Sequence, residues 1–132
     1  MKRKTRVWVG LLAALIIGVI AYFMVGEATH GPVIGFEPTS LSFAAEEGVN
    51  PQSQILSIKN AGVGNMPWSV SSDAQWLNLN PTIGTSSGEI DKVTVSLDIS
   101  GMSPGDYSAT ITITATKAPN SPQTVPVKLH IS

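Results

Sequence analysis

The sequence predicts an all-β fold, a seven-stranded antiparallel sandwich, preceded by one N-terminal transmembrane α-helix. Three observations predict this fold class. Residues 7–26 form a long uncharged run behind a basic N-terminus, apolar and polar residues alternate in short runs from residue 36 onward, and clusters rich in Gly, Pro and Asn separate those runs. The pattern beyond residue 26 is not helical.

The first element is the uncharged run, because about 20 apolar residues in a helix cross the hydrocarbon core. Its N-terminal side carries Lys2, Arg3, Lys4 and Arg6. Positive charge marks the cytoplasmic side, so we expect residues 1–6 as a cytoplasmic basic tip and residues 7–26 as a signal anchor in the lipid bilayer of the cell (inner) membrane. The remaining chain is then periplasmic or extracellular. The alternative is a secreted protein whose signal peptide is cleaved near Ala28.

The external part is acidic and has no cysteine. It holds all nine acidic residues but only four of the eight basic ones, which are Lys59, Lys92, Lys117 and Lys128. Nucleic acid is therefore excluded as a partner, because phosphates need a surplus of Lys and Arg. Without disulfides, the hydrophobic core of one domain of about 100 residues must hold the fold.

The next element is a linker at residues 27–35, interrupted by Gly31, Pro32 and Gly35. It reaches about 30 Å at most, so the domain lies close to the membrane. Seven strands follow within the domain at residues 36–132, each with alternating inward residues. In chain order these are Leu41 and Phe43; Leu56 and Ile58; Trp68 and Val70; Leu77 and Leu79; Val93, Val95, Leu97 and Ile99; Tyr107, Ala109, Ile111, Ile113 and Ala115; and Val125, Val127, Leu129 and Ile131.

Two residues refine the topology. Pro126 predicts an edge position for the last strand, because proline donates no ladder hydrogen bond. Tyr107 follows Met102–Asp106 at the start of the longest strand, which resembles the tyrosine corner of Greek-key sandwiches. This predicts an immunoglobulin-like Greek key in which the Tyr107 hydroxyl bonds to the upstream backbone. The alternative is a tyrosine that contacts a ligand.

The segments together resemble a BACON-type immunoglobulin-like domain over residues 36–132. The matching residues are Leu41-x-Phe43, Leu56-x-Ile58-x-Asn60-x-Gly62, Trp68-Ser69-Val70, Asp73 to Pro81, Gly84, Gly88, Gly105 to Ile111 and Val125-Pro126-Val127. The resemblance implies carbohydrate binding, because such domains are often attached to carbohydrate-active enzymes. In this chain a predicted membrane helix stands where an enzyme module would be.

The sequence suggests no catalytic, metal or cofactor site, and we expect a protein that is not an enzyme. His30 falls in the linker and His130 on the polar phase of the last strand, and no carboxylate cluster accompanies either in the sequence. Glu46 and Glu47 are adjacent in a turn, so they cannot flank a scissile bond.

Trp76, with Asn78 and Asn80, is the predicted ligand-binding site. Trp76 is out of phase with Leu77 and Leu79 in a regular strand, and would point outward between the two asparagines. The alternative is a bend that places Trp76 over one end of the core. The row Thr110, Thr112, Thr114 and Thr116 is interpreted as a solvent face, with glycan binding as its alternative.

The predicted function is a non-catalytic accessory or scaffolding subunit of a membrane protein complex. The short linker favours this function, as do small residues on the helix that suit packing against other subunits, namely Gly10, Ala13, Ala14 and Gly18. The alternative is a surface-displayed module for carbohydrate binding or for protein binding in adhesion, with a glycan as the possible partner.

Overall fold

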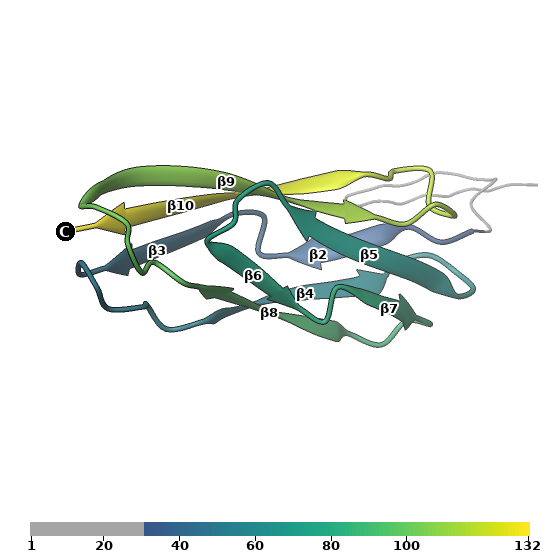
Figure 1. Cartoon of the computed structure of the whole chain (residues 1–132). Coiled ribbons are helices and arrows are strands. Elements are labelled where there is room, and N and C mark those ends of the chain that lie inside the picture. The colour runs from purple at the N-terminus through teal and green to yellow at the C-terminus, as the bar shows by residue number, and fades with distance from the viewer. Residues whose placement is uncertain (1–30) are drawn as a thin grey trace, which may run out of the picture. The chain divides into compact units, whose positions relative to one another are not determined.

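The computed structural model describes residues 31–132. Nine strands in this part form two packed sheets (Figure 1). The five-stranded sheet has the order β3 (Leu41–Ala45), β10 (Gln123–Ile131), β9 (Gly105–Thr114), β5 (Met66–Ser72) and β7 (Ile83–Ser86). The four-stranded sheet has the order β2 (Ile34–Glu37), β4 (Gln54–Asn60), β8 (Asp91–Leu97) and β6 (Leu77–Asn80).

The predicted transmembrane helix at residues 7–26 and the basic tip at residues 1–6 lie outside the described residues. Between residues 31 and 132 the structure contains no helix that is both long and apolar enough to span a membrane.

The β-sandwich is confirmed, but the described residues hold nine strands where the sequence predicted seven. The additional strand β2 lies partly in the predicted linker at 27–35, and β7 lies in the predicted turn between Pro81 and Gly88. Each has four residues, too few for a clear alternation. Pairing with a longer neighbour defines them instead: β2 pairs with β4, and β7 pairs with β5.

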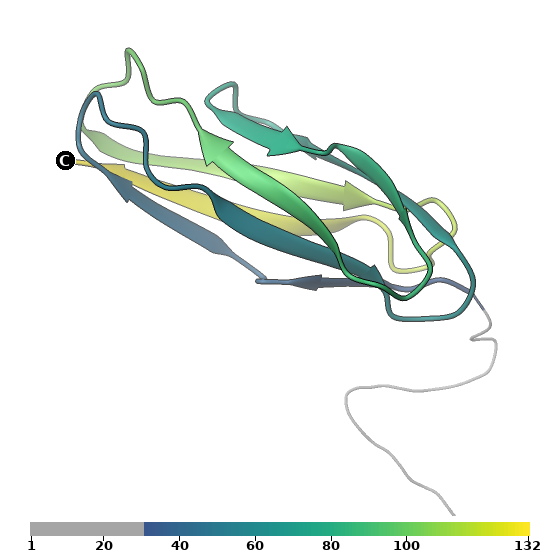
Figure 2. The same cartoon turned by 90° about the horizontal axis from the view of Figure 1, so that it is seen from below.

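The prediction of purely antiparallel pairing was wrong for one pair of strands. β3 and β10 run parallel, from Leu41 opposite Val127 to Ala45 opposite Ile131 (Figure 2). The parallel pair arises because the chain changes sheets. After β2 it leaves the four-stranded sheet, passes Pro38, and continues as β3 in the five-stranded sheet, beside β10.

The edge position predicted from Pro126 was also wrong, because β10 lies between β3 and β9. The parallel ladder with β3 starts only at Val127, one residue after Pro126. At Pro126 the strand therefore has a neighbour on one side alone, where Thr110 of β9 is opposite. An interior strand accepts proline at such a position because no ladder bond is missing.

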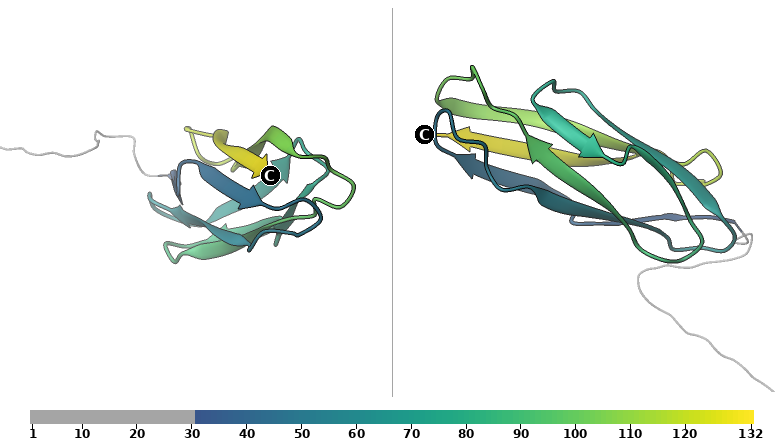
Figure 3. Two further views of the ribbon diagram at one scale, coloured as in Figure 1. Left: turned by 90° about the vertical axis from the view of Figure 1, so that its left-hand side faces the viewer. Right: turned by 60° about the horizontal axis from the view of Figure 1, so that its bottom comes forward.

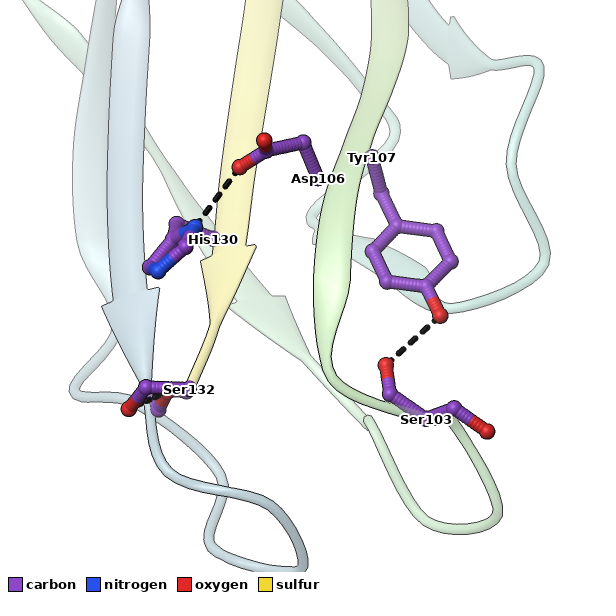
Figure 4. A network of polar contacts seen from close by, with 6 residues as sticks. Ser103, Asp106, Tyr107, His130 and Ser132 are labelled. Carbon is purple, nitrogen blue, oxygen red and sulfur yellow. Dashed lines mark hydrogen bonds and ion pairs between the residues drawn. The ribbon is translucent and has the colours of Figure 1, made fainter.

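The two sheets are seen end-on in the left view of Figure 3, and the buried side chains of the core lie between them. All the predicted inward residues are buried except Leu79 and Tyr107, which are half-buried and pack against the core. Ile34, Met66 and Ala118 are further core residues. The tyrosine corner is confirmed, because the Tyr107 hydroxyl donates a 2.7 Å hydrogen bond to the Ser103 carbonyl (Figure 4).

Candidate functional site

Trp76 lies in a turn just before β6. The Ala74 N–H donates to Ser72 Oγ (3.0 Å) and the Leu77 N–H donates to the Ala74 carbonyl (3.3 Å), so the regular strand begins only at Leu77. The Trp76 ring is half-buried, packs against the core and meets the Tyr107 ring edge-to-face, with centroids 6.4 Å apart. The bend places Trp76 over one end of the core, as the alternative interpretation held, and leaves part of the ring exposed.

This turn is tied to both sheets. In the five-stranded sheet, Asp73 Oδ1 accepts a hydrogen bond from the Thr110 N–H (2.8 Å), and the Asp73 N–H donates to the Thr110 carbonyl (3.3 Å). In the four-stranded sheet, the Trp76 carbonyl accepts from the Asp98 N–H (2.9 Å). The backbone that carries the Trp76 ring is therefore bonded to both sheets. The Asp73 contact could not be predicted from the sequence, because Asp73 and Thr110 are far apart in the chain.

A shallow depression of about 330 Å³ lies beside the exposed part of Trp76. It is lined by Gln75, Trp76, Asn78, Asp98, Ser100 and Met102. Of the three predicted site residues, the structure therefore brings Trp76 and Asn78 together. Asn80 is exposed farther along β6 and does not line the depression.

Asp98 supplies the one carboxylate of this depression. Its Oδ1 accepts hydrogen bonds from the Ser100 hydroxyl (2.5 Å) and the Ser100 N–H (3.1 Å). These bonds lower the pKa of Asp98 from its ordinary value, with the hydroxyl as the larger cause. The group is therefore an ionised hydrogen-bond acceptor at neutral pH. Together with the amides of Gln75 and Asn78 and the apolar surfaces of Trp76 and Met102, it suits a small, uncharged, polyhydroxylated ligand.

A second, open depression of about 550 Å³ contains a histidine–carboxylate hydrogen bond that was not predicted from the sequence. Nδ1 of His130 lies 2.6 Å from Oδ1 of Asp106 (Figure 4). No carboxylate cluster accompanies His130 in the sequence, but the antiparallel register places Asp106 directly opposite it. Both side chains are largely exposed, at 60% and 86%, so their pairing contributes little to stability.

The predicted threonine row follows β9 as far as Thr114, and Thr116 lies beyond the end of the strand. Thr112 faces Ser71 of β5 on one side and Thr124 of β10 on the other. The three threonines within β9 are half-buried on the outer face of the five-stranded sheet.

Solved structures of several proteins share this fold. A Bacteroides ovatus GH5 xyloglucanase in complex with a XXXG heptasaccharide matches with a TM-score of 0.58 and 21% identity, over 75% of this chain and 19% of that one. A candidate carbohydrate-binding protein from Bacteroides ovatus matches with a TM-score of 0.61 and 15% identity, over 75% of this chain and 37% of that one. The PapD-like domain 7 of human CEP192 matches with a TM-score of 0.56 and 17% identity, over 92% of this chain and 94% of that one.

The chain thus spans about a fifth of the xyloglucanase and just over a third of the second Bacteroides protein. No curated protein matches the chain by sequence. A family model described as the viral BACON domain matches residues 33–130, which is most of the chain and nearly all of the described sandwich. The chain therefore belongs to the viral BACON domain family, as the resemblance found in its sequence implied.

Proposed function

We propose that this chain is a non-catalytic binding module, held at the outer surface of the cell membrane by residues 7–26, with a glycan as its ligand. The observation that carries the proposal is the depression beside Trp76. There an aromatic ring, two amide side chains and an ionised carboxylate converge on one surface. The carbohydrate-linked proteins among the structural neighbours support the same ligand class.

The geometry fits a saccharide for a specific physical reason. A pyranose ring has an apolar face and a rim of hydroxyl groups. Trp76 and Met102 offer apolar contact, while Asp98 accepts and Asn78 both donates and accepts hydrogen bonds. The depression is shallow, so the ligand would remain largely in solvent and bind weakly.

The test compares two asparagines on the same strand. The full chain in lipid nanodiscs is screened on a glycan array, and any hit is titrated against Asn78→Ala and Asn80→Ala. We expect Asn78→Ala to lose most of the affinity and Asn80→Ala to keep it, because only Asn78 lines the depression. Equal affinities of both variants would contradict this site, and no binding to any glycan would contradict the ligand class.

A second function is that of an accessory or scaffolding subunit of a membrane complex. It is favoured by the small number of residues between the predicted anchor and the first strand. The Val33 carbonyl already accepts a hydrogen bond from the Ala61 N–H (2.8 Å), and β2 starts at Ile34. A domain that begins this soon after the predicted anchor reaches partners in or near the same membrane. Affinity purification from native membranes in mild detergent tests this function, and a lone monomer throughout would count against it.

Retention of the anchor needs its own measurement. The mass of the mature protein shows whether residues 1–28 remain. A mature chain that begins after Ala28 would overturn the membrane location and leave the glycan proposal standing.

A further inference from the structure

We propose that the free edge of β7 pairs with β7 of a second copy of this chain, in an antiparallel arrangement centred on Gly84. The two five-stranded sheets would then form one continuous sheet across a two-fold axis. This proposal is independent of the ligand proposed above, because no residue of β7 lines the Trp76 depression.

The hydrogen bonding of β5 with β7 shows which backbone groups face outward. The Val70 N–H donates to the Thr82 carbonyl (2.8 Å), so this pair is of the hydrogen-bonded type. Such pairs alternate along an antiparallel ladder, which makes Ser69–Ile83 and Pro67–Thr85 the pairs without hydrogen bonds. Pro67 agrees with this assignment, since it has no N–H to donate. The N–H and C=O groups of Ile83 and Thr85 therefore point away from β5.

Two other sheet edges among residues 31–132 are covered by side chains, whereas that of β7 is open. At β2, the Asn120 side chain accepts from the Ile34 N–H (3.0 Å) and donates to the Ile34 carbonyl (3.1 Å), as a neighbouring strand would. At β3, the Gln54 side-chain amide donates to the Ser42 carbonyl (2.7 Å). Within the described part of the chain, no comparable bond reaches the outward groups of Ile83 or Thr85.

The remaining edge strand, β6, has fewer free backbone groups with which another strand could pair. The Leu77 N–H is already bonded to the Ala74 carbonyl, and Pro81 ends the strand. Edge strands usually carry a charge or a proline that prevents pairing with another chain. The sequence of β7, Ile-Gly-Thr-Ser, has neither, and the Ile83 side chain is 71% exposed. This is the edge on which a further strand can be added.

The strand is complementary to itself, which argues for a second copy as the partner. With Gly84 opposite Gly84 of the other copy, Ile83 lies opposite Thr85 on both sides of the axis. Each of these two pairs exchanges two backbone hydrogen bonds. The strand itself carries no charge, and the residues opposite it on the outer face, Pro67 and Ser69, are uncharged, so no charged side chain of these positions meets its own copy.

A cysteine cross-linking experiment tests the register directly, because the chain has no cysteine of its own. Full-length Ile83→Cys and Thr85→Cys carry different affinity tags and are mixed in detergent under mild oxidation. Directly opposite residues have Cα atoms about 5.5 Å apart, within disulfide range, whereas the diagonal 83–83 and 85–85 pairs are about 7–8 Å apart. We expect the mixed pair to cross-link several-fold more than either variant alone. Ser108→Cys on the exposed face of β9 serves as the control for random collision.

A second measurement uses variants that block the edge. Two differently tagged copies of the full chain are co-purified, with Ile83→Lys or Thr85→Pro in both. Thr85→Pro removes an outward N–H and leaves the bonds to β5 in place, while Thr85→Val is its matched control. We expect both blocking variants to lose most of the co-purified partner and Thr85→Val to retain it, with the far-UV circular dichroism of all three unchanged. Equal cross-linking of mixed and single variants, or co-purification that both blocking variants leave unchanged, would overturn the proposal.

Discussion

The indole N–H of Trp68 donates a 2.8 Å hydrogen bond to Oδ2 of Asp91 and so connects the two sheets through the core. Trp68 is on β5 of the five-stranded sheet, and Asp91 begins β8 of the other. Trp68 is 4% exposed, so its indole N–H depends on Asp91 as an acceptor more than on water. This bond is one of the polar connections between the two sheets, as is the buried bond from the Asn60 N–H of β4 to Ser86 Oγ of β7 (2.9 Å).

Replacement of the Asp91 side chain should destabilise the fold. Asp91→Ala leaves the buried indole N–H without an acceptor, which costs about 1–3 kcal/mol in the free energy of unfolding. Urea denaturation monitored by circular dichroism measures this loss in the free energy of unfolding. Asp106→Ala is the control, because Asp106 is 86% exposed and pairs only with an exposed histidine. A loss for Asp91→Ala no larger than that for Asp106→Ala would contradict the role of this bond.

Gly84→Ala should also be destabilising, because Trp68 fills the space where a side chain would begin. A Cβ at Gly84 would lie 2.7 Å from Cε2 of the Trp68 ring, closer than van der Waals contact. We expect a loss of about 1–3 kcal/mol from the forced shift of a buried ring. The same denaturation experiment on Gly31→Ala, where no atom lies within 4 Å, should show almost no change.

Tyr107→Phe isolates the hydrogen bond of the tyrosine corner. The ring that supports Trp76 remains, and only the 2.7 Å bond to the Ser103 carbonyl is lost. The expected cost is about 0.5–1.5 kcal/mol in the free energy of unfolding. Tyr107→Leu should cost more, because it also removes the aromatic contact with Trp76. If the two variants were equally stable, the contact between the Tyr107 and Trp76 rings would contribute nothing to the free energy of unfolding.

The Asp98–Ser100 contact predicts a titration that can be measured residue by residue. Because the Ser100 hydroxyl holds the pKa of Asp98 below its ordinary value of 3.8, Ser100→Ala should raise this pKa toward that value. A depressed carboxyl pKa stabilises the fold above the unfolded-state pKa, and the contribution disappears as the pH falls through the folded-state pKa.

Carbon-detected NMR of the side-chain carboxyl measures this titration. Glu89 is the internal control, since its lowered pKa arises mainly from the Ser87 N–H and should not change in Ser100→Ala. An unchanged pKa of Asp98 in this variant would contradict the assigned cause.

Alternation predicted most of the core, because side chains of a strand point in turn to opposite faces. This is why residues such as Ile111 and Val127 were placed correctly without any tertiary information. The alternation of apolar and polar residues could not predict which strands pair. Neither the parallel alignment of β3 with β10 nor the strand character of β7 leaves a local signal, since both depend on neighbours distant in sequence.

The candidate site was predictable only in part, for the same reason. Trp76 and Asn78 stood out as residue types near a break in the pattern. Asp98 and Ser100 reach the same depression from the chain beyond β8, and only the register of β6 with β8 brings them there. The Asp106–His130 pair was hidden in the sequence until the strand order placed β9 beside β10.

The parallel pairing of β3 and β10 has a mechanical consequence. Once β2 has separated from β4, a force between the two ends of the domain pulls the start of β3 and the end of β10 in opposite directions along the strand axis. The paired positions between Leu41–Val127 and Ala45–Ile131 then carry the load together, whereas an antiparallel terminal pair would open one bond after another. In a domain tethered at its N-terminal end and pulled from its C-terminal end, this pair would therefore separate all at once at a high force.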